Sequence, residues 1–267
     1  MDLFCFFGNL FIYRILEIGT AMRLNGKSAI ITGAASGFGQ GIATEFAKQG
    51  AQVMVADIAH EAAEQHAKTI NGISCKVDVS NNESVQNMID KALKEFGKID
   101  ILVNNAGITH LKAPLDDVTE DEFDRVIAVN AKSVYLTAKH LIPLMKKEKK
   151  GSILNVASTA GISPRANLSW YNASKGWMIT ATKTMAVELA PFGIRTNAIC
   201  PVAGETPLLK SFMGEDTPEI REKFLATIPI GRFSTPQDMA NAALFLCSDE
   251  ASMITGVALE VDGGRCI

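Results

Sequence analysis

Tyr171 and Lys175 are the two side chains of this sequence that are best placed for proton transfer. They lie four positions apart in a helical pattern, so both project from one face of the helix. A free phenol has a pKa of about 10, too high for efficient proton exchange at neutral pH, but a neighbouring ammonium group stabilises the phenolate and lowers that pKa. Because this spacing is common on solvated helices, the pair predicts acid–base chemistry only together with the residues around it.

Ser158 and Asn130 are the further candidates for catalysis. Ser158 follows a predicted strand and precedes Tyr171 by thirteen residues, where its hydroxyl could hold a substrate oxygen beside the phenol. Asn130 interrupts the otherwise apolar helical segment from Val126 to Val134. A buried amide that satisfies only itself is the alternative interpretation of Asn130.

A glycine-rich turn lies directly between the first predicted strand and a helical run that we expect to begin at Gln40. The turn reads Thr32-Gly33-Ala34-Ala35-Ser36-Gly37-Phe38-Gly39. Its glycines allow a tight turn and leave the amide groups at a helix N-terminus uncovered, as a pyrophosphate group requires. An ordinary loop is the alternative, but the position between strand and helix favours a dinucleotide site that includes Ser36 and Phe38.

The second predicted strand ends in Asp57, eighteen residues after Gly39 and next to Ile58. At this distance a carboxylate can accept both hydroxyls of an adenosine ribose. It would repel the 2′-phosphate of NADP, and no arginine or lysine stands in the glycine turn or next to Asp57. The sequence therefore predicts NAD as the cofactor, with a simple strand end or helix cap as the alternative role of Asp57.

The glycine pattern TGxxxGxG resembles that of the classical short-chain dehydrogenase/reductase family, and the resemblance covers Gly26 to Gly264. It is most similar to the 3-oxoacyl-[acyl-carrier-protein] reductase and glucose 1-dehydrogenase subgroup. The motifs that agree are Thr32 to Gly39, Asp78, Asn104-Asn105-Ala106-Gly107, Asn130, Ser158, Tyr171-x-x-x-Lys175 and Pro201 to Thr206.

The resemblance implies a role for most of these positions. Asp78 and Val79 are expected to bracket the adenine, and Asn104 to Gly107 to close the fourth strand near the cofactor. Asn130 is expected to bend its helix and to fix a water linked to Lys175.

One stretch departs from the family pattern. Relatives usually have Pro-Gly after the sixth strand, whereas this chain reads Pro201-Val202-Ala203-Gly204-Glu205-Thr206. Thr206 keeps its spacing from the proline, but Gly204 occupies the position that holds the nicotinamide carboxamide. We expect Gly204 and Thr206 to contact the cofactor in a loop that swings differently.

These residues together predict an NAD(H)-dependent oxidoreductase that transfers a hydride between nicotinamide and a secondary alcohol or ketone, with Tyr171 as general acid and base. A 3-oxoacyl-[acyl-carrier-protein] reductase that uses NAD(P)H is one alternative. A non-catalytic NAD-sensing module is another, although it has no need for the four catalytic candidates.

The small-molecule substrate is expected to contact the segments that follow the carboxyl ends of strands, at residues 109–114, 160–170 and 205–225. These segments offer His110, Arg165, Trp170, Phe212 and Met213. Arg165 could pair with a substrate carboxylate, but a solvated arginine is the more common case. The residues do not identify the substrate.

Short apolar runs alternate with helical patterns about every twenty-five residues, which is typical of a parallel sheet built from strand–helix units. The predicted fold is a single-domain, Rossmann-type, doubly wound α/β structure with helices on both faces of a seven-stranded parallel sheet. Three helix starts carry capping signals: Ser80-x-x-Glu83, Thr119-x-x-Glu122 and Thr235-Pro236. The predicted strands are Ser28–Thr32, Gln52–Asp57, Ser74–Val79, Ile99–Asn104, Ser152–Val156, Arg195–Ile199 and Ala258–Val261.

The composition narrows the remaining classes. The 267 residues carry a formal net charge of −3 without a concentrated basic face, so we expect no nucleic-acid partner. Five cysteines without a CxxC pair and four histidines without an HExxH motif predict no metal site, no disulfide framework and a cytoplasmic location.

The apolar N-terminal segment differs from the rest of the chain. We interpret residues 1–21 as an N-terminal extension, disordered or produced by an upstream start, and residues 22–267 as the dinucleotide-binding catalytic domain. A membrane-touching anchor is the alternative for the apolar stretch Leu3 to Ile18, which is too short for a membrane span. The family resemblance implies a homotetramer, with apolar stripes on two long helices and Cys266-Ile267 near a subunit boundary.

Overall fold

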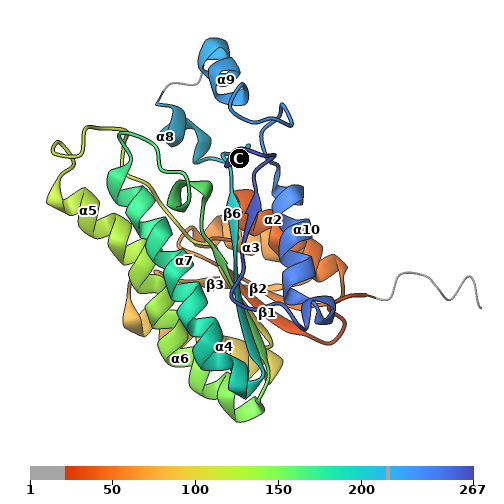
Figure 1. Ribbon diagram of the computed structural model, residues 1–267. Coiled ribbons are helices and arrows are strands. Elements are labelled where there is room, and N and C mark those ends of the chain that lie inside the picture. Colours follow the sequence, from red (N-terminus) through yellow and green to blue (C-terminus); the bar gives the residue numbers. More distant parts are fainter. Residues whose placement is uncertain (1–21, 215–216) are drawn as a thin grey trace, which may run out of the picture.

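A computed structural model describes residues 22–214 and 217–267, so the predicted extension at residues 1–21 lies outside the described residues. Seven parallel strands form one sheet in the order β3-β2-β1-β4-β5-β6-β7. Helices cover both faces of the sheet (Figure 1), which confirms the predicted doubly wound fold. The strands are β1 Ser28–Thr32, β2 Gln52–Asp57, β3 Ile73–Lys76, β4 Ile101–Asn104, β5 Gly151–Val156, β6 Ile194–Pro201 and β7 Ala258–Val261.

The third and sixth strands differ most from the prediction, while β4 begins two residues later and β5 one residue earlier than predicted. Strand β3 ends at Lys76 rather than Val79, because its only neighbour, β2, ends at Asp57, which pairs with Lys76 in the register. Strand β6 continues to Pro201, because β7 pairs with it up to that residue. Strand ends therefore depend on the neighbouring strand, which local sequence does not contain.

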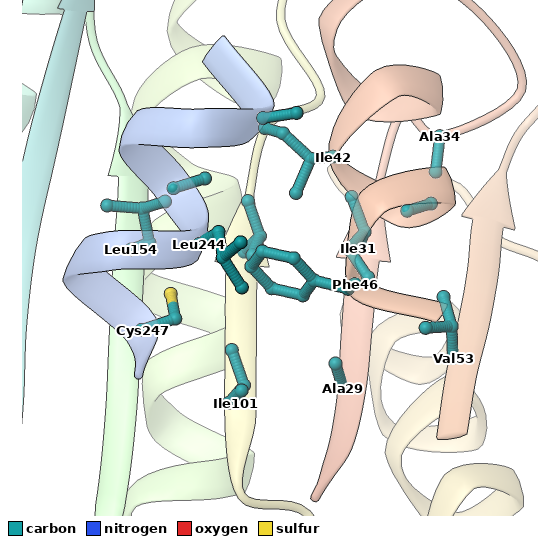
Figure 2. Packing of buried hydrophobic residues seen from close by; sticks show 14 of the residues in the cluster. Ala29, Ile31, Ala34, Ile42, Phe46, Val53, Ile101, Leu154, Leu244 and Cys247 are labelled. Carbon is teal, nitrogen blue, oxygen red and sulfur yellow. The ribbon is translucent and has the colours of Figure 1, made fainter. Parts of the chain in front are cut away.

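Two helical layers bury opposite faces of the sheet. Helices α2 (Gly37–Lys48), α3 (His60–Thr69) and α10 (Pro236–Cys247) cover one face, and α4 (Asn82–Phe96), α6 (Ser133–Glu148) and α7 (Ser169–Leu189) cover the other. Along β1 the side chains alternate, with Ile31 in the first layer and Ile30 in the second. Figure 2 shows Phe46 of α2 beside Leu244 of α10, where the two helices meet over the sheet.

The helix starts follow two of the three capping predictions. Thr119 and Glu122 form a capping box at α5 (Glu120–Ile127), and Thr235 caps α10 together with Asp238. The predicted Ser80–Glu83 box is wrong, because the Ser80 hydroxyl donates to Asp78 Oδ1 instead. The neighbouring Asn81 caps α4.

The remaining elements are short helices that lie at the carboxyl edge of the sheet, continue the long helices or join them to the next strand. Helices α8 and α9 lie beyond this edge (Figure 1). These elements are η1 Ala128–Lys132, η2 Thr159–Gly161, η3 Ala190–Phe192, α8 Leu209–Met213, α9 Pro218–Leu225 and η4 Asp249–Ala251. Among the helices of the described chain, none has the length and apolar character needed to cross a bilayer.

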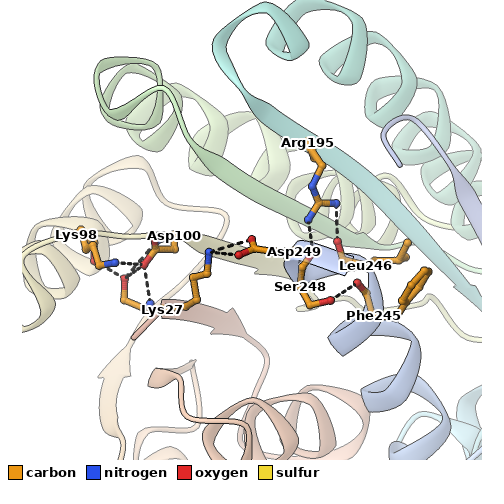
Figure 3. Close-up of polar contacts among 9 residues, drawn as sticks. Lys27, Lys98, Asp100, Arg195, Phe245, Leu246, Ser248 and Asp249 are labelled. Atoms are coloured by element: carbon orange, nitrogen blue, oxygen red, sulfur yellow. Dashed lines mark hydrogen bonds and ion pairs between the residues drawn. The ribbon is translucent and has the colours of Figure 1, made fainter. Parts of the chain in front are cut away.

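Polar contacts fix α10 at the opposite, amino edge of the sheet (Figure 3). The Arg195 guanidinium donates to the carbonyl oxygens of Leu246 and Ser248, at 2.7 and 3.0 Å, which satisfies the C-terminal end of the helix. Lys27 Nζ lies 3.1 Å from Asp249 Oδ1. These contacts lie at the amino edge of the sheet and do not occupy its carboxyl edge.

Candidate active site

A cavity of about 600 Å³ opens at the carboxyl ends of the strands. It reaches from the glycine turn to helices α7, α8 and α9, at the edge where open α/β sheets bind their ligands. Most of the predicted site residues line it: Gly33, Ser36, Gly37, Phe38, Asp57, Ile58, Asp78, Val79, Asn105, Ala106, Gly107, Ser158, Tyr171, Lys175, Gly204 and Thr206.

The glycine turn packs too tightly for side chains. A Cβ atom on Gly33 would lie 2.8 Å from the Cα of Ala106, and Gly37 has a φ of +58° with Thr206 3.3 Å from its Cβ position. Helix α2 begins at Gly37, three residues earlier than expected, because Gln40 N already donates to Ser36 O. Ser36 is the N-cap residue of α2, and its side chain forms no capping hydrogen bond, so the first amide groups of the helix are left uncovered as a pyrophosphate requires.

Asp57 lines the cavity at the end of β2 and is held by the backbone. Its Oδ2 accepts from Ala35 N at 3.0 Å, and its Oδ1 accepts from Ala59 N at 2.9 Å. Local sequence patterns did not point to Lys76, which pairs with Asp57 in the β2–β3 register. Lys76 is exposed and does not line the cavity. Only the strand register brings this positive charge next to the ribose position.

Asn105 joins the fourth strand to the glycine turn. Its Nδ2 donates to the carbonyl oxygens of Thr32 and Gly33, at 2.8 and 3.0 Å. The Thr32 hydroxyl accepts from the backbone amides of Asn105 and Ala106 in return. These bonds fix the turn against the end of β4 and thereby shape the cavity floor.

Two predicted cofactor residues lie behind the cavity wall. Asn104 is buried, donates to Asn155 Oδ1 at 2.9 Å and accepts from the Thr137 hydroxyl. A Cβ atom on Gly39 would collide with Asn105 Nδ2. Neither residue lines the cavity. Asn104 uses its side chain in hydrogen bonds within the protein, and Gly39 packs against Asn105, so both support the cavity wall from behind.

Three of the four candidate catalytic side chains, those of Ser158, Tyr171 and Lys175, line the cavity together. Lys175 Nζ lies 5.9 Å from the centroid of the Tyr171 ring and donates to Val156 O at 2.8 Å. Ser158 follows β5 and accepts from Ala160 N at 3.1 Å. Helix α7 positions Tyr171 and Lys175 one turn apart, as their spacing predicts.

Burial dominates the ionisation of this group. It raises the pKa of Tyr171 to about 12, which the Ser158 side chain and the charge of Arg165 partly oppose. Burial also lowers the pKa of Lys175 to about 8, since no carboxylate contributes to its stabilisation. The protein alone thus keeps the phenol protonated, and an added positive charge is needed to make it a base at neutral pH.

Asn130 lies in a π-helical turn, η1, between α5 and α6. Its Oδ1 accepts from Ile108 N and its Nδ2 donates to Ile108 O, each at 2.9 Å, and to Ser174 Oγ at 3.0 Å. The side chain does not line the cavity, but a Cβ atom on Gly107 would lie 3.4 Å from both Asn130 Oδ1 and Lys175 Nζ. Asn130 of η1 and Lys175 of α7 therefore both approach Gly107.

Comparison with known proteins identifies the family of this chain. A family model described as enoyl-(acyl carrier protein) reductase matches residues 33–265. The 4-formylbenzenesulfonate dehydrogenase of Comamonas testosteroni is 48% identical over 254 residues, which cover 92% of this chain and 100% of that protein. The chain belongs to the classical short-chain dehydrogenase/reductase family.

Two further relatives place it near the 3-oxoacyl-[acyl-carrier-protein] reductases of this family. The reductase of Thermotoga maritima is 42% identical, covering 92% of this chain and 100% of that protein. The crystal structure of the 3-ketoacyl-(acyl-carrier-protein) reductase of Brucella melitensis, complexed with NADH, is 50% identical with a TM-score of 0.87. It covers 91% of this chain and 100% of that one.

Gly204 explains the departure of this short-chain dehydrogenase from the usual Pro-Gly pattern. A Cβ atom at this position would collide with the ring of Phe38 and would lie 2.6 Å from Ser234 Oγ. Gly204 also forms a bridge with Ser234. The glycine is needed because Phe38, which stands in the glycine turn, approaches the backbone of this loop.

The substrate end of the cavity contains two of the five predicted residues. Arg165 and Phe212 line it, together with Leu168 and Phe224. The Phe212 ring centroid lies 5.2 Å from that of Tyr171.

His110, Trp170 and Met213 do not line the cavity, and this part of the prediction is wrong. His110 is buried with its Nδ1 2.7 Å from Leu111 O. Trp170 packs edge-on against Phe123, and Met213 is buried in a separate apolar cluster. A loop segment alone does not show in which direction its side chains point.

One group of metal-ligand types does meet in the described part of the chain, at Glu260, Asp262 and Cys266. Both Asp262 oxygens already accept backbone amides, from Gly264 and Cys266. Burial raises the pKa of the Cys266 thiol to about 11, which disfavours the thiolate that a metal would need. The hydrogen bonds give this group a role in the C-terminal turn.

Proposed function

We propose that the chain is an NAD(H)-dependent oxidoreductase that transfers a hydride between nicotinamide and a secondary alcohol or ketone. One observation carries this proposal: Ser158, Tyr171 and Lys175 line the same cavity as the glycine turn and Asp57. A dinucleotide held on the turn and on Asp57 would extend toward the phenol. A non-catalytic NAD-sensing module gives no reason for three catalytic side chains to meet there.

The chain's own residues would handle the proton. Ser158 holds the substrate oxygen, and Tyr171 removes its proton while the C–H bond breaks; in the reverse direction Tyr171 returns the proton to the carbonyl oxygen. When bound, the nicotinamide accepts or supplies the hydride. The Tyr171 hydroxyl is thus the only group that must change its protonation at the reacting oxygen.

Lys175 prepares the phenol for this role. Its ammonium group stabilises the Tyr171 phenolate electrostatically, against a burial that raises the pKa of Tyr171 to about 12. The oxidised nicotinamide would add a second positive charge at this end of the cavity. Asn130 and Val156 O hold the surroundings of Lys175 in place.

Asp57 supports NAD over NADP as the cofactor. Both of its oxygens are oriented by backbone amides at the edge of the cavity, where they would accept the ribose hydroxyls and repel a 2′-phosphate. The Brucella melitensis relative was crystallised with NADH. Lys76 opposes this preference for NAD, because its positive charge would attract a 2′-phosphate. Its side chain does not line the cavity.

Reduction of 3-oxoacyl-[acyl-carrier-protein] substrates with NAD(P)H is the second candidate, since two of the relatives carry this activity in their names. The Comamonas testosteroni relative is instead named for a small aromatic aldehyde with a sulfonate group. Turnover of purified protein with NAD or NADP across secondary alcohols, ketones and 3-oxoacyl esters separates the two. Preference for 3-oxoacyl thioesters with NADPH would favour the second candidate.

We further propose a cytoplasmic homotetramer. The four cysteines of the described chain, at positions 75, 200, 247 and 266, are all free thiols, which is typical of a reducing compartment. Tyr135 on α6 and Trp177 and Val187 on α7 are large apolar side chains that the monomer leaves exposed. Such an exposed face favours contact between subunits.

A further inference from the structure

Arg165 brings a positive charge to the wall of the catalytic cavity. It stands in the loop between η2 and α7, and its carbonyl oxygen accepts from Asn172 Nδ2 at 2.7 Å, which fixes the loop to α7. Its guanidinium carbon lies 4.2 Å from the centroid of the Phe224 ring. The side chain is half-buried and lines the same cavity as Tyr171.

No acidic side chain neutralises this charge among the residues that the structure describes. Every ion pair found there involves other residues, and the guanidinium donates no hydrogen bond. A guanidinium has five N–H donors, and burying part of such a group without partners is costly. The contact with the Phe224 ring places the guanidinium over an aromatic group and supplies no hydrogen-bonding oxygen for its N–H groups.

A second positive charge, that of Arg265, acts on Arg165. Arg265 opposes the ionisation of Arg165, and its own Nε is buried without a hydrogen-bond partner. The pKa of Arg165 is lowered to about 10, mainly by burial, so the group remains a cation at neutral pH. Two arginines of like charge near one cavity leave a local excess of positive potential.

The reacting end of the cavity lies within the field of this charge. Arg165 acts electrostatically on Tyr171, and the apolar surfaces of Leu168, Phe212 and Phe224 line the same space. A ligand that fits here has one oxygen at Ser158 and Tyr171, an apolar body, and an anionic group at Arg165.

We propose that Arg165 binds an anionic group of the substrate, a carboxylate or a sulfonate. The substrates are then alcohols and carbonyl compounds that carry this group at the end away from the reacting carbon. This inference rests on the proposed function, since it assigns the substrate class of the same site. Arg165 acts in binding, and Tyr171 retains the proton transfer.

A structural role for Arg165 is the competing explanation, in which the guanidinium only supports α9 through Phe224. The two explanations differ in what a neutral replacement does. Loss of support would weaken turnover of charged and uncharged substrates alike. Loss of an anion-binding group would raise KM for anionic substrates alone.

The test compares matched ketones with NADH as reductant: 4-acetylbenzoate with its methyl ester, and 5-oxohexanoate with its methyl ester. Wild type should prefer the free acids by about tenfold or more in kcat/KM, as charge-assisted pairing implies. Arg165→Gln should remove this preference through KM and leave the esters within about twofold, while Arg165→Lys restores part of it. Parallel losses for acids and esters in Arg165→Gln would overturn the proposal.

Lys183→Gln is the matched control, since Lys183 is exposed on α7 and lies outside the cavity. It also removes one positive charge but should leave the acid preference unchanged. A loss of preference in this control equal to that in Arg165→Gln would show that only net charge matters and would overturn the proposal.

A binding experiment separates this inference from the proposed function. Calorimetry with NADH present should show cyclohexanecarboxylate binding about tenfold more tightly than cyclohexanecarboxamide in wild type, and equally in Arg165→Gln. This outcome without any turnover would support the anion site and reject the proposed reaction. Turnover of the neutral esters with no preference for carboxylates in binding would support the reaction and reject the anion site.

Discussion

The Nζ atom of Lys175 lies 5.9 Å from the centre of the Tyr171 ring, on the same helix and at the wall of the same cavity. Both groups are almost completely buried, and no carboxylate contributes to the ionisation of either. The position favours catalysis at the expense of folding, because a buried ammonium group must be kept charged where water does not solvate it.

Lys175 should therefore lower the stability of the protein at neutral pH. Its pKa is about 8 in the folded chain, against 10.5 for the exposed side chain, so the unfolded state binds more protons between these values. The free energy of unfolding therefore rises with pH between about 8 and 10.5, as the buried ammonium group loses its proton. As the pH falls through about 8 this gain is lost, and the buried charge destabilises the folded state fully.

Lys175→Met should then raise the free energy of unfolding at pH 7, by about 3 kcal/mol at most, while abolishing most activity. The gain should shrink as the pH approaches 10.5. Urea unfolding at several pH values measures it, with Lys183→Met on the exposed side of α7 as the control. A gain that is constant with pH would contradict this explanation.

Asp57 should set the choice of cofactor. We expect wild type to use NAD at least about tenfold more efficiently than NADP, or about 1.4 kcal/mol of discrimination. Asp57→Asn should narrow the ratio, because the 2′-phosphate is then no longer repelled, and Asp90→Asn on the exposed side of α4 should not change it. Equal use of both cofactors by wild type would remove Asp57 from this role.

Lys76→Gln tests the positive charge that the strand register places beside Asp57. Any residual use of NADP should decrease in this variant, while kcat/KM with NAD stays within about twofold.

His66 should make stability depend on acidic pH. It is buried, with Nδ1 2.9 Å from Ala34 O under the glycine turn and Nε2 3.0 Å from Thr44 Oγ1. Burial lowers its pKa below 6.5, so its contribution is fully present above about pH 6.5 and is lost as the pH falls through its folded value. His66→Gln should flatten the loss of stability as the pH falls below 6.5, and His60→Gln, at an exposed position, should leave the wild-type slope.

Much of the fold could be predicted because strand and helix patterns are local. The bounds of β1, β2 and β7 agree with the predicted ones, and Thr119 and Thr235 cap helices as their sequences indicate. The Ser80 box failed because Asp78, only two residues away, competes for the same hydroxyl. A capping signal is thus reliable only when no nearby carboxylate offers another partner.

The site could be predicted only where its residues belong to ordered motifs. Tyr171, Lys175, Ser158 and the glycine turn reach one cavity because strand ends meet at one edge of a parallel sheet. Whether Arg165 or His110 turns toward that cavity depends on loop packing, and whether Lys76 meets Asp57 depends on register. Neither the loop packing nor the strand register can be obtained from the local spacing of residues.

The apolar stripes that were expected between subunits lie mostly inside the monomer. Val134 and Leu141 of α6 and Met178 and Leu189 of α7, which belong to these stripes, are buried, whereas Trp177 of α7 is exposed. The exposed face of α6 and α7 therefore consists of side chains other than those of the predicted stripes.

Assembly should nevertheless depend on this outer face. We expect light scattering to give four times the chain mass of 28.7 kDa, and Trp177→Glu to shift it toward smaller species because a charge would be buried at the contact. Lys48→Glu is the control for added negative charge, since Lys48 is exposed on α2, which covers the opposite face of the sheet. A stable, fully active monomer of wild type at micromolar concentration would refute the tetramer.

The most direct test of the central claim is single-turnover hydride transfer by Tyr171→Phe, with NADH binding followed by its fluorescence in the same samples. The change deletes one oxygen from a residue that packs 5.2 Å from Phe212, so fold and NADH affinity should stay nearly unchanged. Hydride transfer to a ketone should slow by on the order of a hundredfold or more, because no other side chain at the reacting oxygen can supply the proton. Transfer at the wild-type rate, with NADH bound equally well, would show that Tyr171 is not the proton donor.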